Sequence, residues 1–241
     1  MTDLLLVHGL TYDHRTWGPL RDELGPEWRV RAVDLPGHGD APRLGSYAMR
    51  DVVEVVHEQA KDLTEPIVVG HSVGAIIATA YAAAYPAAAV LNLDQPLLLG
   101  PFGAAVRAAE PVLRGPDWRT VWDRMLAGMG IDALPDDARR LVETATDPRP
   151  DLLLGYWGEI LRHSDAEIAE QRRAELAAIA ARGIGYHLVT GSEPPAAYLA
   201  WLTNLVPDAG VTVLPGGHFP HLAHPAAVAR ILAALRAGRR L

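Results

Sequence analysis

The chain has 241 residues, 49% of them hydrophobic, which is enough for one α/β domain with a large buried core. Its net charge is −7 and its basic residues are scattered along the chain, which argues against the clustered positive surface that nucleic-acid binding needs. The sequence contains no cysteine, which excludes disulfides and thiolate chemistry.

The apolar segments are too short or too interrupted to span a membrane. Residues 73–91 come closest, but they are rich in alanine and are broken by Thr79 and Pro86. Residues 1–3 lead directly into the first predicted strand and leave no room for a signal peptide. We therefore expect a cytoplasmic protein with no membrane partner.

Short apolar runs alternate with longer helical patterns through most of the chain. The runs predict about six strands, at residues 4–7, 30–33, 67–69, 90–93, 186–189 and 211–214. The helical patterns lie at residues 18–24, 48–63, 74–84, 196–204 and 225–237. This alternation predicts the α/β fold class, with a mostly parallel sheet covered by helices on both faces.

The segment from about residue 100 to residue 182 interrupts the alternation. It contains helical patterns separated by prolines and no convincing strand. No internal repeat or linker indicates a second domain, so we expect residues 1–241 to form a single domain. The segment 100–182 would then be a helical lid inserted over one edge of the sheet.

Residues 70–74, Gly-His-Ser-Val-Gly, fit the Gly-x-Ser-x-Gly pattern of a nucleophile elbow. Such a serine occupies a strained turn between a strand and a helix, and the small residues two positions away let the chain pass itself. The flanking residues agree, because a predicted strand precedes the motif and a predicted helix follows it. The pattern therefore predicts Ser72 as a nucleophile at a helix N-terminus, where backbone N–H groups favour an anion.

With this motif, three further segments make the chain resemble the α/β-hydrolase family over nearly its whole length. They are Leu-Val-His-Gly-Leu at 6–10, Asp-Leu-Pro-Gly-His-Gly at 34–39 and Gly-His-Phe-Pro-His-Leu at 217–222. The resemblance implies that the N–H groups of Leu10 and Val73 form an oxyanion hole, and that His218 is the general base. The family opens with a β-hairpin before its His-Gly strand, so we expect this hairpin to be missing here.

The other residues of these segments have simpler expected roles. Asp34, His8 and His38 resemble the family's turn residues, which hold loops together through hydrogen bonds. His221 and His224 lie within a turn or two of His218, and we expect them to be solvated or to cap a helix. They lack a carboxylate partner at ligand spacing, so no metal or organic cofactor is implied.

The acid that would hold the His218 imidazole in the correct tautomer has two candidates. The family usually takes this acid from the loop after the strand at 186–189, but here Pro194 occupies the usual position and Glu193 is shifted by one residue. Asp94 follows the strand directly after the nucleophile helix, where some members of the family place their acid. We favour Asp94 and keep Glu193 as the alternative.

Large apolar side chains of the insertion are candidates for contact with a substrate. One group has the spacing of a single helix face, and a second group follows later in the segment. They are Trp118, Trp122, Met125 and Met129, and then Tyr156 and Trp157. We take Trp122, Tyr156 and Trp157 as substrate-binding residues, although each could simply pack on the main domain.

Together these patterns predict a serine hydrolase that cleaves a carboxylic ester, thioester or lactone through an acyl-serine intermediate. Its partner would be a small molecule with an apolar body. The alternatives are a lyase or a cofactor-free peroxidase that uses the same triad, or a ligand receptor of the same fold that is not an enzyme. The oligomeric state is not determined by the sequence.

Overall fold

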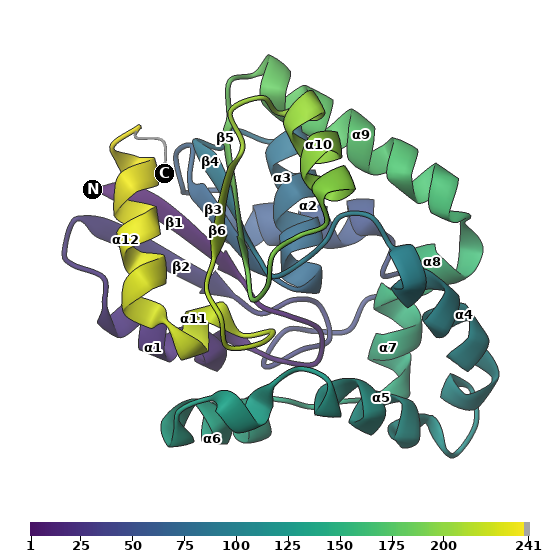
Figure 1. Cartoon of the computed structure of the whole chain (residues 1–241). Coiled ribbons are helices and arrows are strands. Elements are labelled where there is room, and N and C mark those ends of the chain that lie inside the picture. The colour runs from purple at the N-terminus through teal and green to yellow at the C-terminus, as the bar shows by residue number, and fades with distance from the viewer. Residues whose placement is uncertain (239–241) are drawn as a thin grey trace.

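The computed structural model describes residues 1–238 and has an α/β fold built on one parallel sheet (Figure 1). Its strand order is β2-β1-β3-β4-β5-β6, and every neighbouring pair is parallel. The strands are β1 (Thr2–Val7), β2 (Trp28–Val33), β3 (Ile67–His71), β4 (Ala89–Leu93), β5 (Gly185–Thr190) and β6 (Gly210–Val213). The predicted fold class is confirmed, and within residues 1–238 no hairpin precedes β1.

Helices cover both faces of the sheet. The helices outside the insertion are α1 (Gly18–Asp22), α2 (Met49–Ala60), α3 (Val73–Ala84), α10 (Ala196–Leu205), α11 (Pro220–Ala223) and α12 (Pro225–Arg236), and the 3₁₀ helix η1 spans His14–Trp17. Figure 1 shows α1 and α12 on one side of the sheet and α2, α3 and α10 on the other.

Two hydrophobic cores follow from the alternation of side chains along the strands. Leu5 and Val7 of β1 point into a large core with α2, α3 and α10. Leu4 and Leu6 point the other way, into a smaller core with α1 and α12. All four leucine and valine side chains are fully buried, as expected for a central strand covered on both faces.

The chain between β4 and β5 contains helices joined by turns and loops, and Thr146 forms an isolated β-bridge with Tyr12. The helices are α4 (Gly100–Leu113), α5 (Trp118–Ala127), α6 (Asp136–Thr144), α7 (Pro150–Tyr156), α8 (Gly158–Arg162) and α9 (Asp165–Ala181), with the 3₁₀ helix η2 at Ile131–Ala133. In Figure 1, α5 and α6 form a layer apart from the sheet, whereas α9 packs against α3. A capping box of Ser164 and Glu167 fixes the start of α9.

No helix within residues 1–238 combines the length and the apolar character that crossing a membrane requires.

Candidate active site

Ser72 lies in a strained turn between β3 and α3. Its backbone has φ 53° and ψ −128°, a conformation that L-residues rarely adopt. A Cβ atom on Gly70 would lie 2.2 Å from the carbonyl oxygen of Gly74, and one on Gly74 would lie 2.2 Å from that of Val7. The turn therefore has room only for glycine at both positions, and this explains the spacing of the motif.

His218 is bonded to the carboxylate of Asp94. Its Nδ1 donates to Asp94 Oδ2 over 2.8 Å, while Oδ1 of the same carboxylate accepts from the backbone N–H of Gly191 and the hydroxyl of Thr190. Burial alone would raise the pKa of Asp94, but the bonds from His218, Gly191 and Thr190 hold that pKa below its usual value. Asp94 is thus a charged partner at neutral pH, and Nε2 of His218 makes no hydrogen bond to any described residue.

Asp94 meets His218 because of how β4 and β5 end side by side. Asp94 has φ 56°, and its N–H donates to the carbonyl of Val189 at the end of β5. This turn directs the carboxylate toward the loop after β6. Glu193, the alternative, is exposed, and the described part of the chain has no hydrogen bond between it and His218.

Two backbone N–H groups beside Ser72 have no backbone acceptor within residues 1–238. They belong to Leu10 and Val73, and both residues line the same cavity as Ser72 and His218. Among residues 1–238 no hydrogen bond joins Ser72 Oγ to His218, so both side chains remain available to a bound molecule. Catalytic hydrogen bonds are often long before substrate binds and then shorten.

His8 and His38 hold the loop after β1, which carries Leu10, in place through hydrogen bonds, as the resemblance implied. Nε2 of His38 accepts from the N–H of Thr11, and Nε2 of His8 accepts from the N–H of Leu35. Thr11 itself has φ 72°, so the loop that carries Leu10 depends on these bonds for its shape.

His221 does not behave as expected from the sequence. It is fully buried, with neither ring nitrogen bonded to any described residue, so the expectation of a solvated or helix-capping side chain is wrong. Its ring lies 4.5 Å from that of His71, and Nε2 of His71 donates to the carbonyl of His218 over 2.8 Å. The two rings thus support the loop of His218 from behind. His224 is the N-cap residue of α12, but its side chain makes no capping bond, and its Nε2 contacts the carbonyl of Pro215 instead.

The cavity that Ser72, Asp94 and His218 line has a volume of about 550 Å³ and a mostly apolar wall. Trp122, Tyr156 and Trp157 all line it, whereas Trp118 does not. Met129 also lines the cavity but lies beyond the end of α5, so the expected single helix face ends earlier than its spacing indicated. A cavity of this volume with a mostly apolar wall suits a small molecule with an apolar body.

Three polar residues on the wall were not found from the sequence. The hydroxyl of Tyr12 is buried without a partner among the described residues, and burial raises the pKa of that phenol. Buried Arg172 and half-buried Glu159 add an ion pair to the same wall. Their helical spacing gave no indication of burial, because charged residues on helices usually face solvent.

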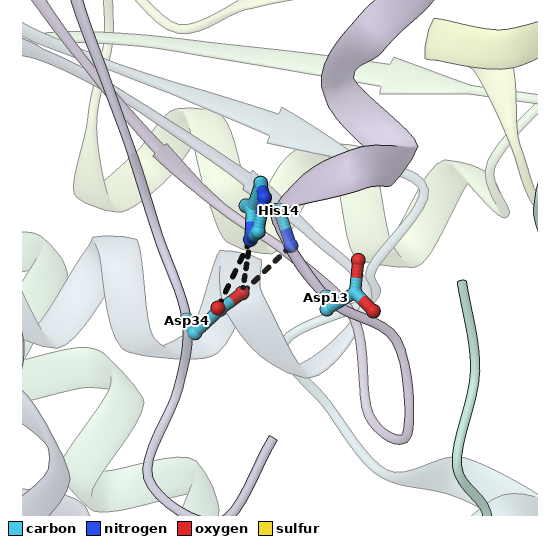
Figure 2. Close-up of side chains that lie close together, drawn as sticks. All are labelled: Asp13, His14 and Asp34. Atoms are coloured by element: carbon cyan, nitrogen blue, oxygen red, sulfur yellow. Dashed lines mark hydrogen bonds and ion pairs between the residues drawn. The ribbon is translucent and has the colours of Figure 1, made fainter. Parts of the chain in front are cut away.

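Within residues 1–238, one cluster of acidic and histidine side chains has its possible ligand atoms close enough together to hold a metal ion. It consists of Asp13, His14 and Asp34, whose ligand atoms lie within 4.8 Å of one another. Figure 2 shows His14 bonded to Asp34 through both its N–H and its ring nitrogen. Asp13 instead caps η1 and pairs with Arg15. These bonds join the loops after β1 and β2, so the structure gives the cluster a structural role.

Comparisons with known proteins find matches that cover most of this chain. A family model described as "Alpha/beta hydrolase family" matches residues 4–231. A pimeloyl-[acyl-carrier protein] methyl ester esterase of Yersinia enterocolitica serotype O:8 / biotype 1B is 26% identical, over 95% of this chain and 91% of that protein.

Two solved structures share the fold at low sequence identity. The enol-lactonase from Burkholderia xenovorans LB400 has a TM-score of 0.74 and 15% identity, covering 98% of this chain and 91% of its own. A protein described by its recognition and ring-cleavage of the Pseudomonas quinolone signal has a TM-score of 0.79 and 17% identity, covering 99% and 92%.

Proposed function

The chain belongs to the alpha/beta hydrolase family, and we propose that it cleaves a carboxylic ester, thioester or lactone through an acyl-Ser72 intermediate. The observation that carries this proposal is the bond between His218 Nδ1 and Asp94 Oδ2, in a cavity that Ser72 also lines. The esterase and lactonase names of its relatives support the same reaction class.

In the proposed mechanism, Nε2 of His218 takes the proton of Ser72 Oγ as this oxygen attacks the substrate carbonyl. Asp94 holds the imidazole in the tautomer with a proton on Nδ1 and stabilises its positive charge when it forms. The N–H groups of Leu10 and Val73 then donate to the tetrahedral oxyanion. His218 passes the proton to the leaving group and activates water for deacylation.

The proposed substrate has an apolar body beside its reactive carbonyl. Trp122 of α5 and Trp157, between α7 and α8, form part of the cavity wall, where they would bury such a body. The insertion would act as a lid in this account. A small-molecule partner and a cytoplasmic location are parts of the same proposal.

A hydrolysis screen with the full chain tests the proposal. We expect turnover of esters, thioesters or lactones, and a loss of about 10⁴ to 10⁶ in kcat for Ser72→Ala, because only the oxyanion hole and binding would remain. Steady turnover also distinguishes an enzyme from a receptor of the same fold. Undiminished hydrolysis by Ser72→Ala would overturn the mechanism.

A further inference from the structure

A buried ion-pair cluster lies in the helical insertion. Arg172 of α9 has a side chain only 2% exposed, and it contacts one carboxylate on each side. Its Nη2 donates to Glu159 Oε2 of α8 over 3.0 Å, and its Nη1 donates to Glu175 Oε2 of α9 over 2.6 Å. A guanidinium removed from water in this way needs such partners, because an unpaired buried charge is strongly destabilising.

Part of this cluster faces the cavity that Ser72 lines. Glu159 and Arg172 are the charged side chains on its wall, within residues 1–238, apart from Asp94 and His218. Their neighbours on this part of the wall are Ile160, on α8, and Ile168, on α9, which are both apolar. An apolar body bound there would therefore lie against polar groups other than those of the proposed triad.

The cluster has a spare acceptor and an excess of negative charge. Oε1 of Glu159 receives no hydrogen bond from any described residue, whereas both oxygens of Glu175 bind Arg172. Two carboxylates around one guanidinium leave a net charge of −1 when both are ionised. Burial raises the pKa of Glu175, against the effect of Arg172, and both of its oxygens are already occupied, which leaves Glu159 Oε1 as the acceptor that a bound group can use.

We propose that Glu159, oriented by Arg172, binds a hydrogen-bond donor on the apolar body of the substrate, either a hydroxyl or an ammonium group. This inference rests on the proposed hydrolase function, since it concerns the same cavity. A carboxylate is a poorer occupant, because Arg172 already faces two carboxylates and a third would be repelled. A methyl-terminated chain would instead leave the polar face of Glu159 buried without a partner.

The test is a series of ethyl esters of increasing acyl length that end in a methyl, hydroxyl, ammonium or carboxylate group. At the best chain length we expect kcat/KM for a hydroxyl- or ammonium-terminated ester to exceed that for the methyl-terminated ester by about tenfold or more. Glu159→Gln keeps an acceptor but removes the charge. The ratio to follow is kcat/KM for a polar-ended ester divided by kcat/KM for the methyl-terminated ester. Glu159→Gln should lower this ratio by about tenfold for the ammonium ester and by less for the hydroxyl ester.

Glu170→Gln is the matched control. Glu170 also lies on the insertion, in α9, but it is exposed and pairs with Arg173, so its loss should leave both ratios unchanged. The inference is overturned if the methyl- or carboxylate-terminated ester is preferred at every length, or if Glu159→Gln leaves the ratios unchanged. Should Glu159→Gln fail to fold, the preference of the wild-type chain decides alone.

Failure of the proposed function has a different signature. If no ester of any length is hydrolysed, calorimetry with an alkylammonium ion and the matching alcohol and carboxylate still tests the subsite. Binding of the ammonium or the alcohol that is about tenfold tighter than that of the carboxylate, and is weakened in Glu159→Gln, supports the subsite without the reaction. Equal binding, or no binding, overturns it.

Discussion

The loops at the strand ends and the helical insertion contribute different parts of one cavity wall, and they are held in different ways. At the strand ends, Ser72 and Asp94 have positive φ, and the backbone around positions 70 and 74 has room only for glycine. Trp122 and Trp157 are placed by packing alone, since their rings occur in no hydrogen bond among the described residues. Small changes at the strand ends should therefore affect activity far more than large changes in the insertion.

The largest effect should come from the acid at the end of β4. Asp94→Asn keeps the shape of the side chain but removes the charge that stabilises the His218 imidazole, so we expect kcat to fall by about 10³ to 10⁴. Glu193→Gln is the control, because Glu193 is exposed, and it should change kcat by less than about tenfold. A larger loss in Glu193→Gln than in Asp94→Asn would make Glu193 the acid.

A single methyl group should test the strained turn. Gly74→Ala places a Cβ against the carbonyl of Val7, so the turn must shift, and a displacement near 1 Å can lower kcat about 100-fold. Gly18→Ala is the matched control, because a Cβ there has no atom within 4 Å. If Gly74→Ala hydrolyses the substrate as fast as Gly18→Ala, steric restriction does not hold the turn.

Acid should destabilise the folded chain through three buried histidines that lie outside the helical insertion. His38, His187 and His221 are buried, and burial lowers their pKa values to about 3, about 4 and about 3. Between those values and about pH 6.5 the unfolded chain binds a proton at each histidine and the folded chain does not. The free energy of unfolding therefore decreases as the pH is lowered. Each histidine contributes about 1.4 kcal/mol per pH unit in this range.

Urea unfolding at neutral pH and near pH 5 measures this slope. His221→Leu should reduce the slope by about 1.4 kcal/mol per pH unit, because it removes one buried imidazole. His163→Gln, at an exposed position before α9, is the matched control. Equal stability at both pH values would contradict the conclusion that these histidines are buried in their neutral form.

The smallest effects should come from the insertion wall. Trp122→Ala and Trp157→Ala should lower kcat/KM for long apolar esters by about tenfold and for short esters less, because lost burial scales with contact area. Trp118→Ala is the control from the same helix as Trp122, since Trp118 does not line the cavity. If all three variants treat long and short esters alike, the tryptophans only pack the insertion.

The parts of the molecule that sequence predicted well are those fixed by local rules. All six strands were found, and the inner strands β1, β3 and β4 were the clearest, because a strand buried on both faces is a largely apolar run, as in Leu4 to Val7. The elbow was found because its spacing follows from steric contact within a few residues. Helix α11 was missed, since it spans only Pro220–Ala223.

The parts that sequence left open depend on which distant segments meet. The choice between Asp94 and Glu193 turns on β4 and β5 ending together beneath the loop of His218. The burial of His221 follows from its contact with Trp17, about two hundred residues away in the chain, with ring centroids 4.6 Å apart. The Arg172 cluster joins α8 to α9, and no local spacing indicates that it faces a cavity.

Covalent labelling with a fluorophosphonate tests the central claim, that Ser72 is a nucleophile activated by His218 and Asp94. Intact-mass measurement and peptide mapping should find one adduct per chain, on Ser72, and labelling should be absent in Ser72→Ala and slow in Asp94→Asn. An adduct on another residue, or equal labelling of Ser72→Ala, would contradict the account.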